Sequence, residues 1–172
     1  MRFMVRGVKL EFVHFRDELA RSVVAKAESK PYDGSPLLLM PAKEIATLKA
    51  LAFFGRQKSR DLFDMAIILE RGLMDIEELE RIYSFKQRDG IDLREYAETF
   101  RPDDDEGDAS LDFLPHHRHY RTLAKLGQKE RLERCRELFL EQYDKAQKKR
   151  VEEKMRTAGT VLRKRRKKSR LS

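Results

Sequence analysis

Three cations and two carboxylates near residue 55 have the types and spacing of a phosphate-binding site. Lys49 lies in an otherwise apolar segment, and a basic connection containing Lys58 leads to Arg60. Asp61 and Asp64 follow three residues apart, so both can point the same way from the first turn of a helix. Lys and Arg beside a helix N-terminus suit a polyphosphate, because the cations neutralise its oxygens and free backbone N–H groups donate to them.

The same residues also fit a purely structural role. In that interpretation Lys49 is solvated and Asp61 only stabilises the helix dipole. Asp64 then pairs with Arg60 or Lys58 on its own helix, as charged residues on capped surface helices commonly do. The residue pattern leaves both interpretations open.

The segments that must position these residues are predicted to be helices. Residues 43–54 carry apolar side chains at helical spacing, and Gly55 is expected to end that helix. Ser59 is a natural N-cap for a helix over residues 60–71, and Gly72 stands where a C′ glycine terminates a helix.

Further helices are expected after Gly72. The pairs Asp75 with Glu78 and Asp92 with Glu95 have capping-box spacing, which predicts helices near 76–84 and 93–100. A long final helix is expected from Gln128, with an apolar stripe formed by Leu132, Cys135 and Leu138.

The N-terminal region is predicted to contain strands. Residues 1–6 and 8–15 read as two short strands that form either a hairpin around Gly7 or one bulged strand. Residues 17–28 are expected to be helical or irregular. The apolar run 37–40 follows a loop rich in Pro and Gly, and it is predicted to be a further strand.

These patterns predict an α+β fold in which helices dominate. We expect a small, incomplete sheet from residues 2–15 and 37–40, then a helical bundle from residue 43 to about 150. So small a sheet needs an extra strand, an oligomer contact or a partner to protect its edge. The domains are expected at residues 1–42, 43–150 and 151–172, the last being a disordered basic tail.

Charge is distributed unevenly along the 172 residues, whose formal net charge is +8. Residues 145–172 hold 13 Lys or Arg against Glu152 and Glu153, which gives this segment +11 and leaves −3 for the other 144 residues. Six cations stand in a row at Arg163, Lys164, Arg165, Arg166, Lys167 and Lys168. Such a run can neutralise the phosphates of RNA or DNA without reading sequence.

Composition excludes several classes of protein. No stretch approaches the ~20 apolar residues of a membrane span, and the N-terminus has no secretory h-region. The single cysteine, Cys135, excludes an intramolecular disulfide framework and fits a reducing, cytoplasmic setting. His116 and His119 are spaced to share a metal on a helix, but no nearby cysteine completes a tetrahedral set.

A family resemblance adds to the phosphate interpretation. The order of Lys49, a short basic gap and the run Arg60 to Asp64 (RDLFD) resembles the AbiEii-type nucleotidyltransferases. These are toxin components of bacterial toxin–antitoxin and phage-defence systems. The strand at residues 8–12 and the segment 38–44 also resemble that family's layout, so the resemblance covers about residues 5–75.

The resemblance implies Mg²⁺-dependent transfer of a nucleotide from an NTP to an RNA or protein acceptor, and a cognate antitoxin as partner. By match to the family motif, Lys49 would contact the nucleotide phosphates. Asp61 and Asp64 would organise the site or hold neighbouring basic groups. Glu11 would take the place of a third acidic residue, on a strand beside the metal pair, and Arg60 is a candidate phosphate partner.

The sequence also departs from the polymerase-β-like pattern of that family. A Gly-Ser or Gly-Gly-Thr motif and an Asp-x-Asp strand for two Mg²⁺ ions should precede Glu11, and residues 1–10 contain neither. The acidic run 103–105 lies downstream in a loop, and one strand glutamate cannot hold two ions a few Å apart. We therefore expect a truncated or degenerate relative, the C-terminal part of such an enzyme, that is inactive as this chain alone.

A second function remains open beside the first. The chain would then be a noncatalytic module that binds nucleic acid or a partner protein through the helical bundle and the basic tail. Residues 145–172 contain no Phe or Trp and no Tyr for base stacking, so contact would be with phosphate alone. The tail is also compatible with a merely solubilising terminus.

Overall fold

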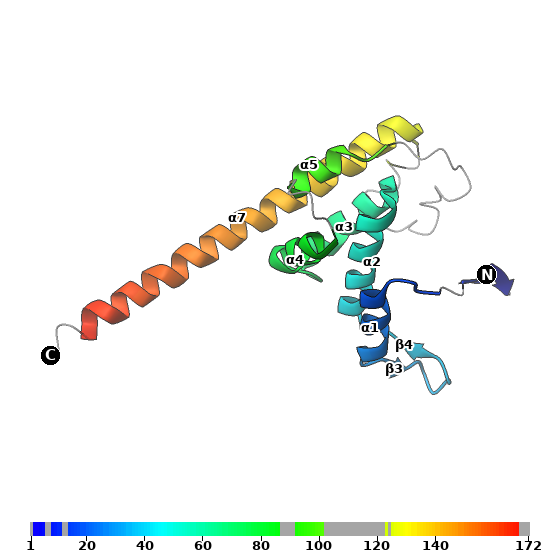
Figure 1. The fold of residues 1–172 in the computed structure, drawn as a ribbon, viewed down its shortest axis with the longest axis horizontal. Coiled ribbons are helices and arrows are strands. Elements are labelled where there is room, and N and C mark those ends of the chain that lie inside the picture. Colours follow the sequence, from blue (N-terminus) through cyan, green and yellow to red (C-terminus); the bar gives the residue numbers. More distant parts are fainter. Residues whose placement is uncertain are drawn as a thin grey trace. The chain divides into compact units, whose positions relative to one another are not determined.

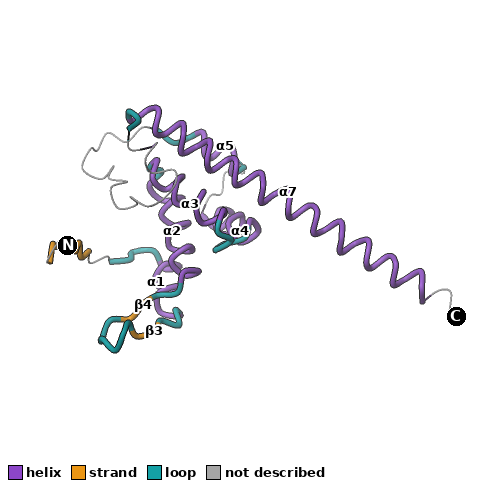
Figure 2. The backbone as a smooth tube through the Cα atoms, turned by 180° about the vertical axis from the view of Figure 1, so that it is seen from behind, coloured by secondary structure: helices purple, strands orange, loops and turns teal. Residues whose placement is uncertain are grey.

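The computed structural model describes residues 2–5, 8–11, 14–86, 92–101, 123 and 125–168. The chain divides into two compact units, Met1–Leu48 and Lys49–Ser172. The predicted α+β class with dominant helices is confirmed, and the strands that the structure describes are all short (Figures 1 and 2).

In the first unit, two strands form a hairpin-type ladder. Strand β1 (Arg2–Val5) pairs antiparallel with β2 (Val8–Glu11), and Arg2 lies opposite Glu11 in the register. The alternative of one bulged strand across Gly7 is therefore wrong, since two separate segments pair with each other.

The rest of the first unit follows the expected order of elements. Helix α1 (Glu18–Lys26) begins after Asp17, whose carboxylate accepts the N–H of Ala20 at 2.9 Å. Strand β4 (Leu38–Leu39) confirms the predicted apolar strand. Its antiparallel partner β3 (Lys30–Pro31) begins just before the segment predicted as a loop.

Helix α2 (Ala42–Arg56) is longer than predicted, and the boundary of the two units falls within it. The prediction that Gly55 ends this helix is wrong, because the last helical residue is Arg56. The left-handed backbone falls on Gln57 instead, at φ +51°. Since two residues connect α2 to the next helix, the chain reverses at Gln57 and needs its left-handed residue there.

Helix α3 (Ser59–Glu70) begins one residue earlier than predicted, with Lys58 rather than Ser59 at the N-cap. Asp61 supplies the capping interaction from within the helix, so no Ser side chain is required. At the other end Gly72 adopts φ +61°, as predicted for a C′ glycine. The N–H groups of Gly72 and Leu73 donate to the carbonyls of Leu69 and Ile68 at 3.1 and 3.0 Å, which completes a Schellman motif.

The two predicted capped helices are confirmed. Helix α4 (Ile76–Lys86) begins after Asp75, which accepts the N–H of Glu78 at 2.7 Å. Helix α5 (Leu93–Glu98) begins after Asp92, which accepts the N–H of Glu95 at 2.8 Å. In both cases a local sequence signal defines the first turn.

Helix α7 (Gln128–Lys168) starts at the predicted residue and has 41 residues, or about 60 Å at 1.5 Å per residue. The run 163–168 was predicted to be disordered. This was wrong for its backbone, because α7 continues to Lys168. The packed first part of the helix supplies the nucleus, and Arg, Lys and Leu propagate a helix well.

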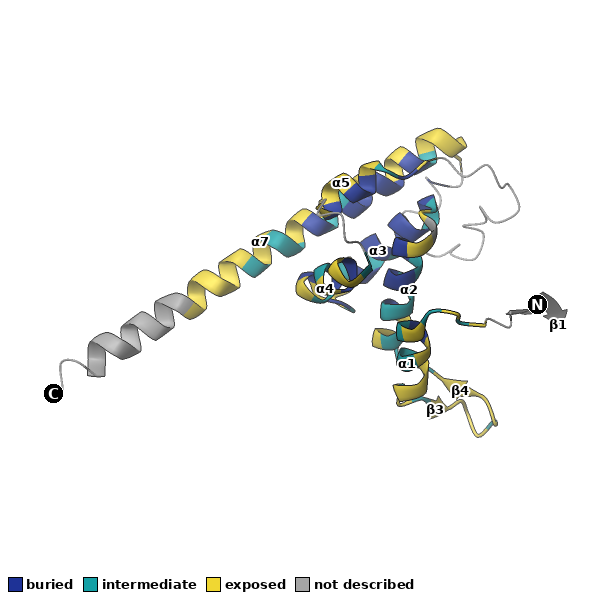
Figure 3. Cartoon of the chain, in the orientation of Figure 1, coloured by how far each residue is buried: buried dark blue, intermediate teal, exposed yellow. Residues whose placement is uncertain are grey.

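The core of the second unit is aromatic. Phe53 of α2 lies 5.4 Å from Tyr96 of α5 and 5.3 Å from Phe139 of α7, measured between ring centroids. Helix α3 packs along α7, and α4 and α5 contact α7 beside it. Figure 3 shows that burial is concentrated in the part of α7 that these helices cover.

A polar network joins α4 to α7. The Glu80 carboxylate accepts hydrogen bonds from Gln147 at 2.7 Å and from Arg150 at 2.5 Å. Gln147 also donates to the Tyr143 hydroxyl at 2.9 Å. Burial raises the pKa of Tyr143, the hydrogen bond from Gln147 lowers it in part, and the nearby Glu80 carboxylate raises it further.

None of the helices described here is both long and apolar enough to cross a membrane.

Candidate functional site

The contact between Lys49 and Asp64 is the central interaction of the candidate site. Lys49 of α2 donates from Nζ to Oδ2 of Asp64 on α3 at 2.7 Å. The Lys49 side chain remains 43% exposed, whereas the Asp64 side chain is 22% exposed. Asp64 therefore pairs with a cation across two helices, and the Lys49 ammonium is still open to a ligand.

This pairing has a signal in the sequence, namely the length of the connection between the two helices. Two residues, Gln57 and Lys58, connect α2 to α3, and so short a connection makes the two helices antiparallel neighbours. Residues equally far from the turn then lie side by side. Lys49 stands eight residues before Gln57 and Asp64 stands seven after it, which brings the two charges together.

Asp61 has a different role from Asp64, although both carboxylates begin the same helix. Its side chain is buried, with 1% of the residue exposed, and its carboxylate accepts the backbone N–H of Lys58 at 3.3 Å. The N–H of Asp61 donates back to the carbonyl of Lys58 at 2.8 Å. Asp61 therefore closes the first turn of α3 and favours the positive end of the helix dipole, as the structural interpretation predicted.

Lys58 and Arg60 flank the first turn of α3, and both side chains are partly exposed. Lys49 lies about two helical turns from the α2–α3 connection along α2, at 1.5 Å per residue. Lys49, Lys58 and Arg60, the three cations that the sequence analysis singled out, therefore stand on one helical hairpin in the second unit. We call this set the α2–α3 corner.

A chain of hydrogen bonds ties the α2–α3 corner to α5. The side-chain amide of Gln57 donates to Oγ1 of Thr99 at 3.1 Å, and the Thr99 hydroxyl donates to the carbonyl of Tyr96 at 2.7 Å. The Tyr96 hydroxyl donates to the carbonyl of Phe53 at 3.2 Å, which returns the chain to α2. The left-handed residue at the corner is thus held by its own side chain.

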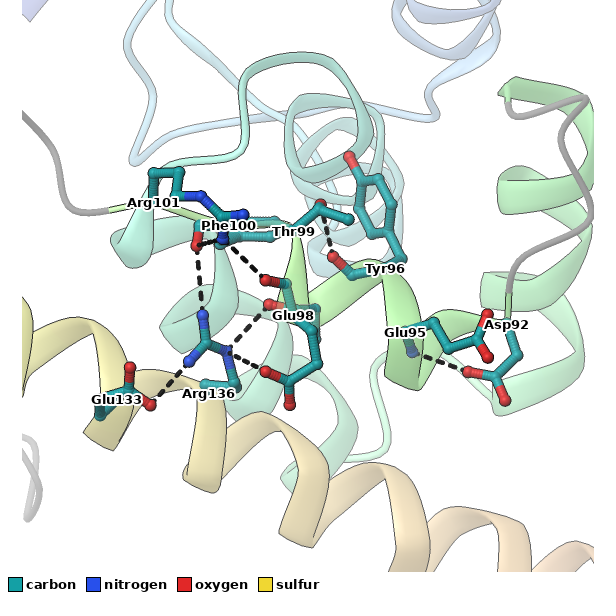
Figure 4. Close-up of polar contacts among 10 residues, drawn as sticks. Asp92, Glu95, Tyr96, Glu98, Thr99, Phe100, Arg101, Glu133 and Arg136 are labelled. Atoms are coloured by element: carbon teal, nitrogen blue, oxygen red, sulfur yellow. Dashed lines mark hydrogen bonds and ion pairs between the residues drawn. The ribbon is translucent and has the colours of Figure 1, made fainter.

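Arg136 supports the end of α5, and it was not among the residues predicted from the sequence (Figure 4). Its guanidinium donates to the carbonyls of Ala97 and Phe100 at 3.0 and 3.2 Å, and the residue is 9% exposed. Glu133 accepts a further hydrogen bond at 2.7 Å. Arg136 thereby satisfies carbonyls that the C-terminus of a helix leaves without partners. The signal for this role in the sequence was that Arg136 directly follows Cys135, which belongs to the apolar stripe of α7.

The other predicted site residues lie elsewhere. Glu11 lies on β2 in the first unit, and no relation between it and the α2–α3 corner follows from the structure. The run 163–168 forms the end of α7, and its backbone is helical. His116, His119 and the acidic run 103–105 lie outside the described residues.

Asp61 and Asp64 are both engaged in contacts that a magnesium ion would have to replace. Within the part of the chain that the structure describes, no group of three or more His, Cys, Asp or Glu residues is placed to hold a metal ion. Asp61 is buried against a backbone N–H, and Asp64 is paired with Lys49. Mg²⁺ prefers accessible oxygen ligands, and it would compete with the Lys58 N–H for Asp61 and with the Lys49 ammonium for Asp64.

Comparison with known proteins agrees with the family resemblance and extends it over most of the chain. The sequence matches the family described as nucleotidyl transferase AbiEii toxin, type IV TA system, over residues 5–167. No curated protein and no solved structure matches the chain.

Proposed function

Because this chain belongs to the AbiEii nucleotidyltransferase toxin family, we propose that its α2–α3 corner binds the phosphates of a nucleoside triphosphate. The observation that carries the proposal is the 2.7 Å contact that presents a partly exposed Lys49 ammonium from the side of Asp64. A lysine placed in this way neutralises phosphate oxygens without having to be ordered by the ligand.

The chemistry of the corner follows from its hydrogen-bonding groups. An ammonium group has three N–H donors, so the contact with Asp64 leaves two donors of Lys49 for phosphate oxygens. Lys58 and Arg60 add two further positive charges near the N-terminus of α3. Asp64 acts as a positioning residue for Lys49, and Asp61 caps the first turn of α3.

Nucleotide transfer requires more than this corner supplies. We propose that the chain binds nucleotide but transfers none unless carboxylates other than Asp61 and Asp64 join the site. Glu11 remains a candidate for one of them by resemblance alone. The RNA or protein acceptor, the cognate antitoxin and a role in phage defence in the cytoplasm likewise belong to this proposal.

The test is equilibrium binding of ATP, GTP, CTP and UTP to the full chain by isothermal titration calorimetry. We expect Lys49→Met to weaken binding about 10-fold or more, because a hydrogen bond to a charged group contributes about 1.5–3 kcal/mol. Lys43→Met, on the same helix, is the matched control and should bind as the wild type does. Equal affinity of wild type and Lys49→Met would refute the proposal.

A transfer assay tests the second part. The chain is incubated with each labelled NTP, total RNA and Mg²⁺, and we expect no labelled RNA. Transfer that disappears in Lys49→Met would show that the chain already contains all the groups that it needs.

The alternative function, binding of RNA or DNA through the run 163–168, makes a different prediction. Removing residues 158–172 would then abolish RNA binding that weakens with salt, while Lys49→Met would bind RNA unchanged. RNA binding that survives the deletion would exclude this use of the tail.

A further inference from the structure

The ends of α2 and α3 both contain a left-handed residue, but the residue type differs. After α3 the left-handed position is Gly72, at φ +61°. After α2 it is Gln57, at φ +51°, although Gly55 stands only two residues earlier. Glycine adopts this backbone without steric cost, whereas a residue with a Cβ atom does not. A strained residue of this kind persists where its surroundings hold it, so the Gln57 side chain is expected to make a contact that glycine could not make.

The Gln57 side chain contacts the C-terminal end of α5. Its amide Nε2 donates to Oγ1 of Thr99 at 3.1 Å, across 42 positions of the chain. The Thr99 hydroxyl donates in turn to the Tyr96 carbonyl at 2.7 Å (Figure 4). A hydroxyl has one proton and two lone pairs, so the Thr99 proton is used within α5 and a lone pair is left for Gln57. The acceptor that Gln57 meets is therefore oriented by α5.

The turn that carries Thr99 is itself fixed by its neighbours. Arg136 of α7 donates to the carbonyls of Ala97 and Phe100, which stand on either side of Thr99 in the sequence. Phe100 is fully buried, and its ring centroid lies 5.2 Å from that of Phe53 on α2. Thr99 therefore stands on a turn that contacts both α7 and α2, and it is a fixed point for the side chain that binds to it.

Gln57 directly precedes Lys58, one of the three cations of the α2–α3 corner. Lys58 is the N-cap of α3 and has extended backbone, at φ −89° and ψ 146°. On its C-terminal side the Asp61 carboxylate accepts the Lys58 N–H at 3.3 Å, and the Asp61 N–H donates to the Lys58 carbonyl at 2.8 Å. On its N-terminal side the contact with Thr99 holds Gln57. The direction in which the Lys58 side chain leaves the turn is therefore determined from both sides.

We propose that Gln57 and Thr99 are positioning residues for nucleotide binding, and that they direct Lys58 toward the phosphates. This inference rests on the proposed function of the α2–α3 corner. Lys49 does not depend on this contact, because Asp64 holds its ammonium group at 2.7 Å from within α3. The corner thus contains two separate supports, one from Asp64 for Lys49 and one from Thr99 for Lys58.

A purely structural role for the contact makes a different prediction. The hydrogen bond between Gln57 and Thr99 lies at the surface, where such a bond adds little to stability. Glycine at position 57 would remove the strain and keep the reversal of the chain, so the fold itself does not need glutamine there. If the contact served the fold alone, its loss would lower stability and leave nucleotide affinity unchanged.

The first experiment compares nucleotide affinity with stability in variants of the full chain. Gln57→Gly keeps the left-handed backbone without the amide, and Thr99→Val keeps the branched shape without the hydroxyl. We expect each to raise the Kd for the NTP that the wild type binds most tightly about 3-fold, less than the loss of a whole hydrogen bond to a charged group. Isothermal titration calorimetry measures the Kd, and urea unfolding of Gln57→Gly should show no loss of stability.

Thr99→Ser is the matched control, because it keeps the hydroxyl, and it should bind as the wild type does. Lower stability of Gln57→Gly and Thr99→Val with unchanged Kd would overturn the proposal. A Kd that rises equally in Thr99→Ser and Thr99→Val would also overturn it, since the hydroxyl would then not be the group that acts.

The second experiment determines which cation the contact serves. Thr99→Val is combined with Lys58→Met and, separately, with Lys49→Met, and the Kd is measured for each single and double variant. We expect Thr99→Val to add no loss to Lys58→Met, because no cation is left to direct, and to add its full loss to Lys49→Met. An equal additional loss in both backgrounds would overturn the assignment to Lys58.

The wild type and Lys49→Met separate this inference from the proposed function. If the wild type binds none of the four NTPs, both fail. Affinity that depends on Lys49 but not on Gln57 or Thr99 overturns this inference alone.

Discussion

The two halves of α7, residues 128–150 and the distal half 151–168, differ in the side-chain contacts that stabilise them. Between residues 128 and 150 the helix buries Leu132, Cys135, Leu138 and Phe139 against α3, α4 and α5. Between residues 151 and 157 every side chain is exposed, and the backbone nevertheless remains helical to Lys168. Side-chain packing therefore ends near Arg150 although the helix does not.

The difference shows that side-chain packing stabilises the first half of α7, whereas the second half depends on backbone hydrogen bonds. Three cations mark the gradient, since the side chains of Arg136, Arg150 and Lys154 are 10%, 26% and 67% exposed. Each is paired with an acidic residue, but the exposure of the cation to solvent rises from Arg136 through Arg150 to Lys154. Their contributions to stability should fall in the same order.

The largest effect is expected from Arg136→Met. The substitution leaves the carbonyls of Ala97 and Phe100 buried without their donor and should lower the free energy of unfolding by about 3 kcal/mol. Urea unfolding followed by circular dichroism measures this loss. Arg134→Met is the matched control, because its pair with Glu137 is exposed on both sides, and it should change stability by less than about 0.5 kcal/mol.

A smaller effect is expected from Arg150→Met. The variant removes one of the two hydrogen bonds to Glu80 while Gln147 keeps the other, so the loss should be about 1 kcal/mol. The same urea titration applies, with Glu80→Gln as the complementary variant. A loss as large as that of Arg136→Met would mean that packing extends beyond Arg150.

The smallest effect is expected from Lys154→Met. Its pair with Glu77 spans 2.9 Å, but both side chains are more than half exposed, so stability should change by less than about 0.5 kcal/mol. The same urea titration measures this change. A loss above 1 kcal/mol would show that the distal half is anchored to the body, which removes the contrast between the halves.

The parts of the fold that could be predicted from the sequence are those with local causes. Asp75, Asp92 and Gly72 act on backbone groups within three or four residues, so the ends of α3, α4 and α5 follow from the pattern. The start of α7 at Gln128 follows from its apolar stripe. The end of α7 did not follow, because the distal half propagates from a helix nucleus that the adjacent packed segment supplies.

The sequence predicts that Lys49, Asp61 and Asp64 stand on two consecutive helices, and the structure has them there. Their use as a phosphate site stays a prediction, and the sequence left open whether the two carboxylates act together or separately. The two carboxylates have different partners, because Asp64 faces α2 across the hairpin and Asp61 faces its own first turn. The position of Asp64 depends on how α2 packs against α3, which the two-residue connection indicates and the spacing of the two carboxylates does not.

The hydrogen-bonded chain from Gln57 through Thr99 and Tyr96 to Phe53 has a consequence for affinity. A loop that a ligand must order loses about 1–2 kcal/mol of backbone entropy per residue on binding. At the α2–α3 corner folding has already removed that freedom, because the turn is bound to α5 at one end and to its own helix at the other. An anion that binds there would not have to order the turn, so this part of the entropy cost would not reduce its affinity.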